Sequence, residues 1–380
     1  MTAGERTIHL FRGAAVLLVA MGLGRFAFTA LLPPMQAAAG FRDADAGMMA
    51  SLNLAGYLAG VLLAGKAPAA WRANLFRGAL IFAVATIAGM GLPLGLLGWD
   101  VVRLVAGFTS GLLFVLATAY VLDSGAAMGP SGAALHFAGV GTGIATGGIV
   151  AAIVPDWRIA WALLGLLALA LAAFGRGLTH SPNKERRIAP PAAPIVWTPI
   201  FVLLSVAYAM EGFGYIVSGT FIVTIIRRLP ETAHLGPFAW VLAGLGAIPS
   251  PLVWSRLAHR YGAWEALTLA YVVQAIGIVL PLSGSPAAAL LAAFSFGFTF
   301  IGITGVSIAL AARMQSGAAA AATAFVTIGY GVGQVIGPWA AGWIASVTAG
   351  FSWPLIGAAS AVALSAALSG LGAVVQRRGV

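Results

Sequence analysis

Two ionisable side chains stand inside long apolar runs of the sequence. Arg25 lies in GLGRFAFTALLPPM (22–35), and Glu211 begins EGFGYIVSGTFI (211–222), which continues an apolar stretch. An unpaired ion at the middle of a bilayer costs about 2.5–3.5 kcal/mol on insertion scales, so each side chain needs a partner, a ligand or a cavity. A guanidinium can hold a carboxylate through two parallel hydrogen bonds, and a carboxyl group can exchange a proton. These residues are therefore candidates for anion binding and for proton coupling.

Several arrangements fit these two residues. In the first, Arg25 binds the carboxylate of a substrate while Phe26 or Phe28 stacks on its organic body. In the second, Glu211 carries the coupling proton, and the two roles can be combined. In the third, Arg25 and Glu211 form a structural ion pair and bind nothing. A pair that opens when substrate arrives would join the first and third, and an arginine held by backbone carbonyls within its own half is a fourth arrangement.

Other polar side chains inside apolar runs extend the candidate site. The further candidates for substrate binding are amide and phenol side chains: Asn53, Tyr57, Tyr215, Tyr330 and Gln334. Asn53 and Tyr57 share a helix face because they are one turn apart, and Tyr215 shares the face of Glu211 for the same reason. His136 is a second candidate for the proton, although a lone histidine more often bonds a neighbouring helix.

The composition places these residues in a membrane protein. Of the 380 residues, 61% are hydrophobic and 8% are charged, and the mean hydropathy is +0.98. A soluble domain is nearer 45–50% apolar and about 25% charged. The net charge of +10 lies mainly in short connectors, which argues against a nucleic-acid partner. With no cysteine, no HExxH pair, no Walker motif and no Ser-His-acid set, the sequence predicts no enzyme, no metal site and no cofactor.

Hydropathy breaks at Pro, Gly and charge clusters predict twelve transmembrane helices. Their approximate ranges are 10–36, 45–65, 74–95, 99–122, 129–153, 157–178, 198–226, 235–256, 263–283, 286–312, 317–346 and 350–374. One polar, Pro-rich connector, THSPNKERRIAPPAAPIVW, stands between the sixth and the seventh. We therefore expect an all-α integral membrane protein with an N-terminal six-helix half (1–178), a cytoplasmic linker (179–197) and a C-terminal six-helix half (198–380).

The charges also predict orientation, and the glycines predict a repeat. Lys and Arg favour the side of the N-terminus by about three to one, so we expect a multi-pass protein of the inner membrane with both termini cytoplasmic. GVGTGIATG (139–147) in the fifth span and GYGVGQVIG (329–337) in the eleventh share four glycines at one offset. Because six spans return the chain to its starting side, the halves are predicted repeats in the same orientation.

The connector SRLAHRYGAWEAL (255–267) resembles the loop signature of the major facilitator superfamily (MFS). Leu257, Arg260, Tyr261 and Gly262 match that signature, whereas His259 stands in place of its acid. A basic loop of this kind can cap helix ends and close a gate, or it can serve as a topology signal alone. Asp123 and Arg313, which end the fourth and tenth spans, are the other gating candidates.

Several motifs are similar to the YbfB/YjiJ branch of bacterial MFS transporters. Besides the runs around Arg25 and Glu211, they are NLAGYLAG (53–60), FAGVGTGI (137–144) and GQVIGPWAAG (333–342). The resemblance implies a central cavity lined by the first, fourth, seventh and tenth spans, with the two halves rocking about it. It supplies a fold and a transport class but no substrate.

Together these observations predict a secondary active transporter that moves a small organic solute across the cytoplasmic membrane by alternating access. We expect proton coupling, an organic anion as substrate, a monomer in the lipid bilayer, and an ion gradient in place of a cofactor. The alternative is an efflux pump for drug-like amphipathic compounds, with Arg25 and Glu211 forming a purely structural pair. Outside transport, a transporter-like membrane sensor is the remaining class.

Overall fold

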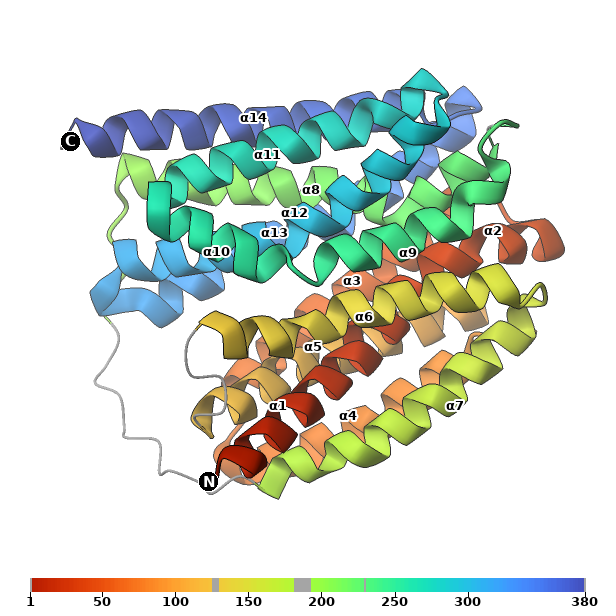
Figure 1. Cartoon of the computed structure of the whole chain (residues 1–380), viewed down its shortest axis with the longest axis horizontal. Helices are drawn as coiled ribbons and strands as arrows, with labels where there is room; N and C mark the ends of the chain where they lie inside the picture. Colours follow the sequence, from red (N-terminus) through yellow and green to blue (C-terminus); the bar gives the residue numbers. More distant parts are fainter. Residues whose placement is uncertain (1, 125–129, 181–192, 229, 379–380) are drawn as a thin grey trace.

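The computed structural model describes residues 2–124, 130–180, 193–228 and 230–378, and two groups of helices lie side by side in it (Figure 1). The first group consists of α1 (Ala3–Leu17), η1 (Leu18–Phe26), α2 (Ala27–Ala39), α3 (Asp43–Lys66), α4 (Ala69–Gly89), α5 (Gly95–Asp123), α6 (Pro130–Ile153), α7 (Trp157–Gly175) and η2 (Arg176–His180). The second consists of α8 (Pro199–Arg228), η3 (Ala233–Leu235), α9 (Gly236–Ala247), α10 (Ser250–Tyr261), α11 (Ala263–Val279), η4 (Leu280–Ser283), α12 (Pro286–Met314), η5 (Ser316–Ala318), α13 (Ala319–Thr348) and α14 (Ser352–Arg377). The described residues contain no β-strand, so the all-α prediction is confirmed.

The membrane-spanning helices follow the predicted ranges. Ten helices, with Gly4–Ala39 counted as one, are long and apolar enough to cross a membrane. The pair α9 and α10, bent by 43° at its break, makes an eleventh. The remaining predicted span, 74–95, overlaps α4, whose first half carries Arg72, Asn74 and Arg77 and is correspondingly less apolar. The membrane-spanning role of α4 stays a prediction.

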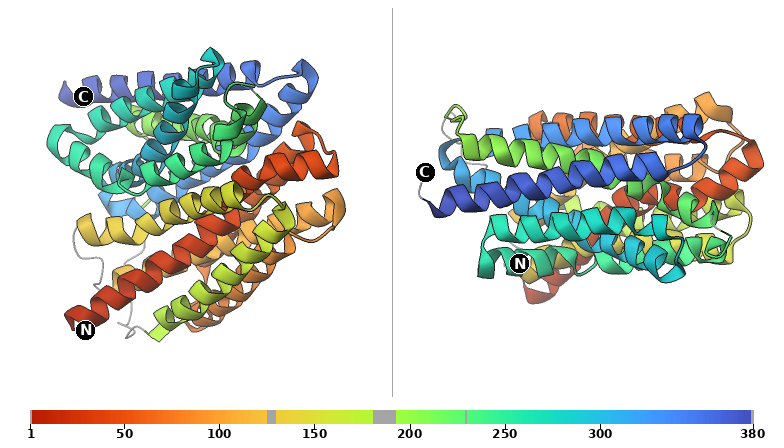
Figure 2. Two further views of the ribbon diagram at one scale, coloured as in Figure 1. Left: turned by 45° about the vertical axis from the view of Figure 1, so that its right-hand side comes forward. Right: turned by 90° about the horizontal axis from the view of Figure 1, so that it is seen from above.

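Both chain termini lie at one end of the helix bundle, which we call the terminal end; the opposite end, where Gly40 ends α2, we call the distal end (Figure 1). Gly40 has a φ of 71°, a left-handed conformation that favours glycine and stops the helix. In Figure 2 (left), the first span slants away from the C-terminal group toward the terminal end. The linker residues 181–192 lie outside the described residues, and the exact boundary between the halves stays a prediction.

The repeated glycines occupy equivalent places in the two halves. Three of each set face the helix that opens their own half: Gly139, Gly143 and Gly147 face the first span, and Gly329, Gly333 and Gly337 face α8. The fourth of each set faces the other half. A Cβ added at Gly141 would lie 2.7 Å from the carbonyl oxygen of Gly244 in α9, and one added at Gly331 would lie 2.9 Å from Leu58 of α3. Small residues thus let α6 and α13 approach both halves closely, as the predicted repeat requires.

Candidate functional site

Arg25 lies at the end of η1, a π-helical segment in the middle of the first span. Its side chain is buried, and its Nη2 donates a hydrogen bond to the hydroxyl oxygen of Tyr215 at 3.1 Å. The guanidinium carbon stands 4.9 Å from the ring centres of both Phe26 and Tyr57. Such cation–π contacts replace part of the hydration that a buried cation loses. Among the described residues no carboxylate lies within ion-pair distance of Arg25.

Arg103 is a second buried arginine beside the first. It projects from α5 and donates to the carbonyl oxygens of Gly24 at 3.1 Å and Arg25 at 3.4 Å. Its guanidinium carbon stands 4.4 Å from the ring centre of Phe28. Carbonyls at the end of a π-helical segment are open to outside donors because the hydrogen-bonding pattern changes there. The site predicted from the sequence does not include Arg103, although Arg103 is the one charged residue between Asp100 and Asp123.

The two guanidinium groups line one small cavity between the halves. The cavity measures about 20 Å³, enough for about one water molecule. Thr29 and Asn53 line it from the N-terminal half, and Gly219 lines it from α8. Across it, the Thr29 hydroxyl donates to the Gly219 carbonyl oxygen at 2.5 Å. The centre of the protein therefore holds two cations with no acidic side chain lining the same cavity.

Tyr215 connects this centre to the C-terminal half. Its hydroxyl oxygen accepts hydrogen bonds from Arg25 and from the amide nitrogen of Gln334. Its ring lies 5.7 Å from that of Tyr330, and the two planes are 11° apart. The Tyr215 ring also stacks on Phe296 and Phe300, with ring centres 6.0 and 5.9 Å apart. The hydroxyl is thus fixed by two donors and the ring by three aromatic neighbours.

The structure brings the predicted substrate-binding residues together, but two of them, Asn53 and Phe28, contact Arg103. The Asn53 amide nitrogen donates to the carbonyl oxygen of Arg103 at 2.9 Å, and Phe28 packs under the Arg103 guanidinium. Phe28 is fully buried there, so it does not offer a face beside Arg25 in this conformation.

Hydrogen bonds across the centre join residues that are repeat counterparts. Arg25 and Tyr215 are 190 residues apart, as are Thr29 and Gly219, which is also the offset between the repeated glycines. Residues near the axis relating the halves therefore contact their own equivalents. Glu211 lies one turn earlier on α8, and no ion pair between Arg25 and Glu211 is formed.

Glu211 is fully buried within the C-terminal half. Neither carboxylate oxygen has a hydrogen-bond partner among the described residues. The Gln274 side chain of α11 lies beside the carboxyl group, while its amide nitrogen donates to Thr299 at 3.0 Å. Glu211 is therefore a buried acid without a compensating cation.

His136 lies apart from this centre. Its Nε2 is 3.1 Å from the hydroxyl of Thr118 in α5, and a Cβ added at Gly13 of α1 would collide with its ring. The side chain is buried and packs against the ring of Phe137. His136 thus joins α1, α5 and α6 within the N-terminal half, a position that favours a packing role.

The predicted gating residues lie at the terminal end, where their charged side chains are exposed. Arg260 stands over the ring of Tyr261 at 5.2 Å, and Gly262 takes a φ of 111° between α10 and α11, a conformation that disfavours other residues. Asp123 and Arg313 are exposed, and neither belongs to the three ion pairs formed among the described residues. The gate pairs expected here are therefore not formed in this conformation.

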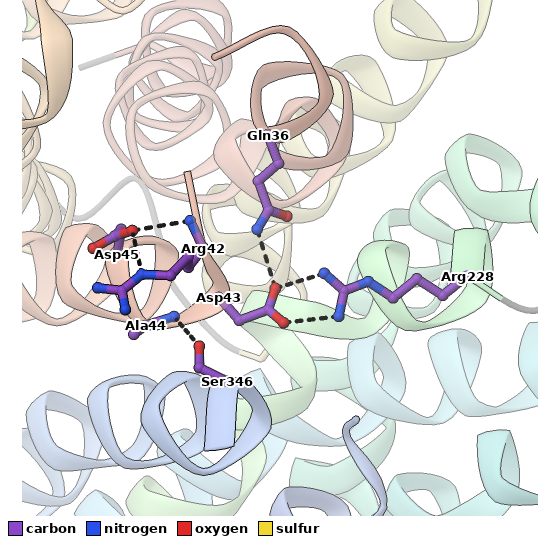
Figure 3. Close-up of polar contacts among 7 residues, drawn as sticks. All are labelled: Gln36, Arg42, Asp43, Ala44, Asp45, Arg228 and Ser346. Atoms are coloured by element: carbon purple, nitrogen blue, oxygen red, sulfur yellow. Dashed lines mark hydrogen bonds and ion pairs between the residues drawn. The ribbon is translucent and has the colours of Figure 1, made fainter. Parts of the chain in front are cut away.

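At the distal end, by contrast, an ion pair joins the halves (Figure 3). The guanidinium of Arg228, at the end of α8, donates two hydrogen bonds of 2.7 Å to the carboxylate of Asp43, at the start of α3. Gln36 donates to the same carboxylate at 3.0 Å, and the amide of Ala44 donates to the Ser346 hydroxyl at 2.9 Å. We call these five residues the distal latch. Sequence reasoning missed it, because nothing local shows which helix ends meet.

The sequence and the fold were compared with known proteins. A family model described as "Uncharacterised MFS-type transporter YbfB" matches residues 17–370. The nucleoside transporter NupG is 15% identical, with a TM-score of 0.73 over 98% of this chain and 99% of that chain. A D-xylose-proton symporter is 14% identical, with a TM-score of 0.74 over 97% of each chain. A bacterial homolog of the human lysosomal transporter Spinster, inward-facing and occupied, is 13% identical, with a TM-score of 0.70 over 98% of this chain and 97% of that chain. No curated protein matches the sequence.

Proposed function

The chain belongs to the MFS-type transporter family of YbfB, and from this premise we propose that it couples the movement of a small organic anion to protons. The family and the fold are those of a multi-pass membrane transporter.

The uncompensated pair of Arg25 and Arg103 carries the proposal for an anion. Two cations this deep in an apolar protein are costly, and carbonyl groups and rings offset that cost only in part. A substrate carboxylate at Arg25 would supply the missing negative charge, and a guanidinium binds it with a planar fork. The rings of Tyr57, Tyr215 and Tyr330 lie next to Arg25 and to one another, and they would contact an organic body once the halves move apart to admit it.

The distal end supports an anionic substrate as well. A pocket of about 570 Å³ lies beside the latch, and its lining includes Arg42, Arg227 and Arg228 but a single acid, Asp43. A concave surface of one charge sign raises the local concentration of an oppositely charged solute. The path to Arg25 from this end would therefore favour anions.

Glu211 is the proposed carrier of the coupling proton. Ionised, its carboxylate would be buried without a cation and without the hydrogen bonds that would offset its charge in this conformation, which is costly. Protonated, it is a neutral group that such surroundings accept. It lies one turn from Tyr215, the partner of Arg25, so a change in its charge is felt at the substrate site.

The basic connectors support an orientation with the terminal end in the cytoplasm of the inner membrane. With the distal latch closed and the gating residues at the terminal end unpaired, the described conformation is then the inward one. Transport would proceed by rocking of the halves about the α3–α13 and α6–α9 seams. We propose a monomer in the lipid bilayer.

A second candidate function is efflux of drug-like amphipathic compounds. The aromatic cluster favours it: Phe26, Trp240, Phe296 and Phe300 pack together with ring centres 5.0–6.5 Å apart. In that case Arg25 and Arg103 would hold the helices together, and a permanent positive charge would favour neutral or anionic compounds over cations.

Ligand-dependent thermal stability of purified protein tests the proposed substrate class. We expect organic carboxylates to stabilise wild type and the exposed-site control Arg158→Ala. Arg25→Ala should bind them about 10- to 100-fold more weakly, because a hydrogen bond to a charged group contributes about 1.5–3 kcal/mol. Equal stabilisation of all three proteins by an anion would contradict the carboxylate site. Stabilisation by neutral amphipathic compounds alone would favour efflux.

A further inference from the structure

Unpaired oxygen atoms are concentrated around Glu211. Of the fourteen buried side-chain nitrogen and oxygen atoms without a hydrogen bond among the described residues, eight lie on α8, α11 and α12 of the C-terminal half. Two of the eight, on Thr224 and Trp264, lie toward the ends of their helices, and the other six belong to Glu211 and its neighbours. All six are oxygens: both carboxylate oxygens of Glu211, the amide oxygen of Gln274, and the hydroxyls of Tyr208, Tyr271 and Ser307. Buried polar atoms are almost always satisfied, so a cluster of this kind needs a cause.

The side chains that carry these six oxygens are neighbours. Tyr208 and Glu211 are three residues apart on α8, and Tyr271 and Gln274 are three apart on α11, so each pair shares a helix face. The Gln274 side chain lies beside the Glu211 carboxyl group, and the Glu211 charge acts on both tyrosine hydroxyls. Ser307 completes the group from α12, next to Tyr271.

The chemistry of this group suits a hard monovalent cation. Carboxylate, amide and hydroxyl oxygens are ligands of hard cations, whereas soft metals prefer sulfur or imidazole. A single carboxylate balances one positive charge, and the described residues hold no group of three or more His, Cys, Asp or Glu for a divalent ion. A proton on Glu211 would provide one donor, enough for a single neighbouring acceptor such as the Gln274 amide oxygen, whereas a cation can be coordinated by several of these oxygens at once.

We propose that Glu211, Gln274, Tyr208, Tyr271 and Ser307 form a sodium-binding site. Sodium and a proton would compete for the Glu211 carboxylate, so the same residue would serve either ion. The consequence for transport rests on the proposed function, whereas binding of the ion does not.

The sodium site is linked to the substrate site through stacked rings. The ring of Tyr208 lies 4.3 Å from that of Tyr330, with planes 8° apart, and Tyr330 in turn stacks on Tyr215. Tyr215 holds Arg25. A cation that fixes the Tyr208 hydroxyl would therefore order the stack that presents Tyr215 to the arginine.

Sodium-dependent thermal stability and binding of radioactive sodium ions to purified, full-length protein test the site. At constant ionic strength, NaCl should stabilise wild type saturably, whereas KCl and choline chloride should not, and acidification should weaken the effect. Tyr271→Phe and Ser307→Ala remove neutral ligands and should lower sodium affinity about 10- to 100-fold. The matched control Tyr261→Phe, at an exposed tyrosine, should bind sodium like wild type.

Glu211→Gln should abolish sodium binding, and Ser307→Ala carries the test if that variant does not fold. Indistinguishable stabilisation by the three salts, or unchanged sodium affinity in Tyr271→Phe and Ser307→Ala, would overturn the proposal. Failure of the two proposals is distinguishable. Carboxylate stabilisation that depends on Arg25 but not on sodium would refute the sodium site alone, and saturable sodium binding without carboxylate binding would refute the anion alone.

Discussion

The two halves both bury charge near the centre, but they surround it differently. In the N-terminal half, Arg25 and Arg103 are held by carbonyl oxygens, a tyrosine hydroxyl and three rings. In the C-terminal half, Glu211 has no hydrogen-bond partner among the described residues. Backbone carbonyls and ring faces are acceptors, so any helix bundle can supply them to a cation. A carboxylate needs hydrogen-bond donors or a cation, and among the described residues of the C-terminal half neither is bonded to Glu211 in this conformation.

This contrast assigns different work to the two centres. The arginines are fixed in place before any ligand arrives, which lowers the cost of ordering them on binding. Glu211, by contrast, would be neutralised by an exchangeable ion under the proposed function. Under the proposed function, one half would bind the solute and the other the ion that drives its transport, and variants that alter one centre at a time test this division.

The largest expected effect is that of Glu211→Gln. The amide cannot exchange a proton, so accumulation driven by a pH gradient in proteoliposomes should be lost, while exchange of substrate against substrate continues. Glu265→Gln is the matched control, because Glu265 pairs with Arg377 on the surface. Gradient-driven accumulation at the wild-type rate in Glu211→Gln would remove the acid from the coupling mechanism.

Arg103→Gln should have the next largest effect. It removes a charge and the two hydrogen bonds that hold the end of η1, so Arg25 loses its backbone support. We expect substrate affinity to fall about 100-fold, with a loss of thermal stability, because each hydrogen bond to a charged group contributes about 1.5–3 kcal/mol. Arg103→Lys keeps the charge but cannot make the two hydrogen bonds of the planar guanidinium, so it separates the contribution of the charge from that of the hydrogen bonds. Unchanged affinity in both variants would show that Arg25 acts alone.

Tyr215→Phe should have a smaller effect, mainly on binding. The ring stack on Phe296, Phe300 and Tyr330 remains, and only the hydroxyl that accepts from Arg25 is lost. Substrate affinity should fall about tenfold, with a modest loss of thermal stability because Gln334 loses the same acceptor. A large loss of stability instead would mean that the hydroxyl holds the halves together and does not tune the arginine.

How much of this the sequence could predict depends on the range of the interactions. In lipid, backbone groups must be satisfied within the helix, so apolar runs predict spans reliably, and glycine patterns predict the seams. Arg25 and Glu211 could be singled out because a charge in an apolar run is conspicuous at once. The repeat offset of 190 was also visible, and it already pairs Arg25 with Tyr215.

The remaining features depend on geometry that no local pattern fixes. The carbonyls that accept from Arg103 are available because η1 is π-helical, and the sequence around Gly24 does not announce that segment. One alternative predicted from the sequence was an ion pair between Arg25 and Glu211, which assumed two regular helices. Arg25 instead contacts Tyr215, one helical turn after Glu211 on α8. The distal latch joins two helix ends that are 185 residues apart, which only the assembled fold brings together.

The smallest expected effect is at that latch. Asp43 and Arg228 are favourably placed at the start of α3 and the end of α8, where helix dipoles attract an anion and a cation. The Arg228 side chain is nevertheless 48% exposed, so the pair should contribute about 1 kcal/mol or less. Asp43→Asn should therefore raise the fraction of molecules open at the distal end only a few-fold, measured as labelling of a cysteine introduced beside the pocket.

The charge swap Asp43→Arg with Arg228→Asp is the control for the latch. It exchanges the sign at each helix end and so reverses the dipole contribution while keeping the pair. If the pair itself closes the distal end, the double variant should recover part of the closure that Asp43→Asn loses. If the double variant is as open as the single one, the packing of α3 against α13 keeps the distal end closed and the ion pair contributes little. In that case, of the charges that join or line the two halves, only the buried Arg25, Arg103 and Glu211 would remain as candidates for controlling transport.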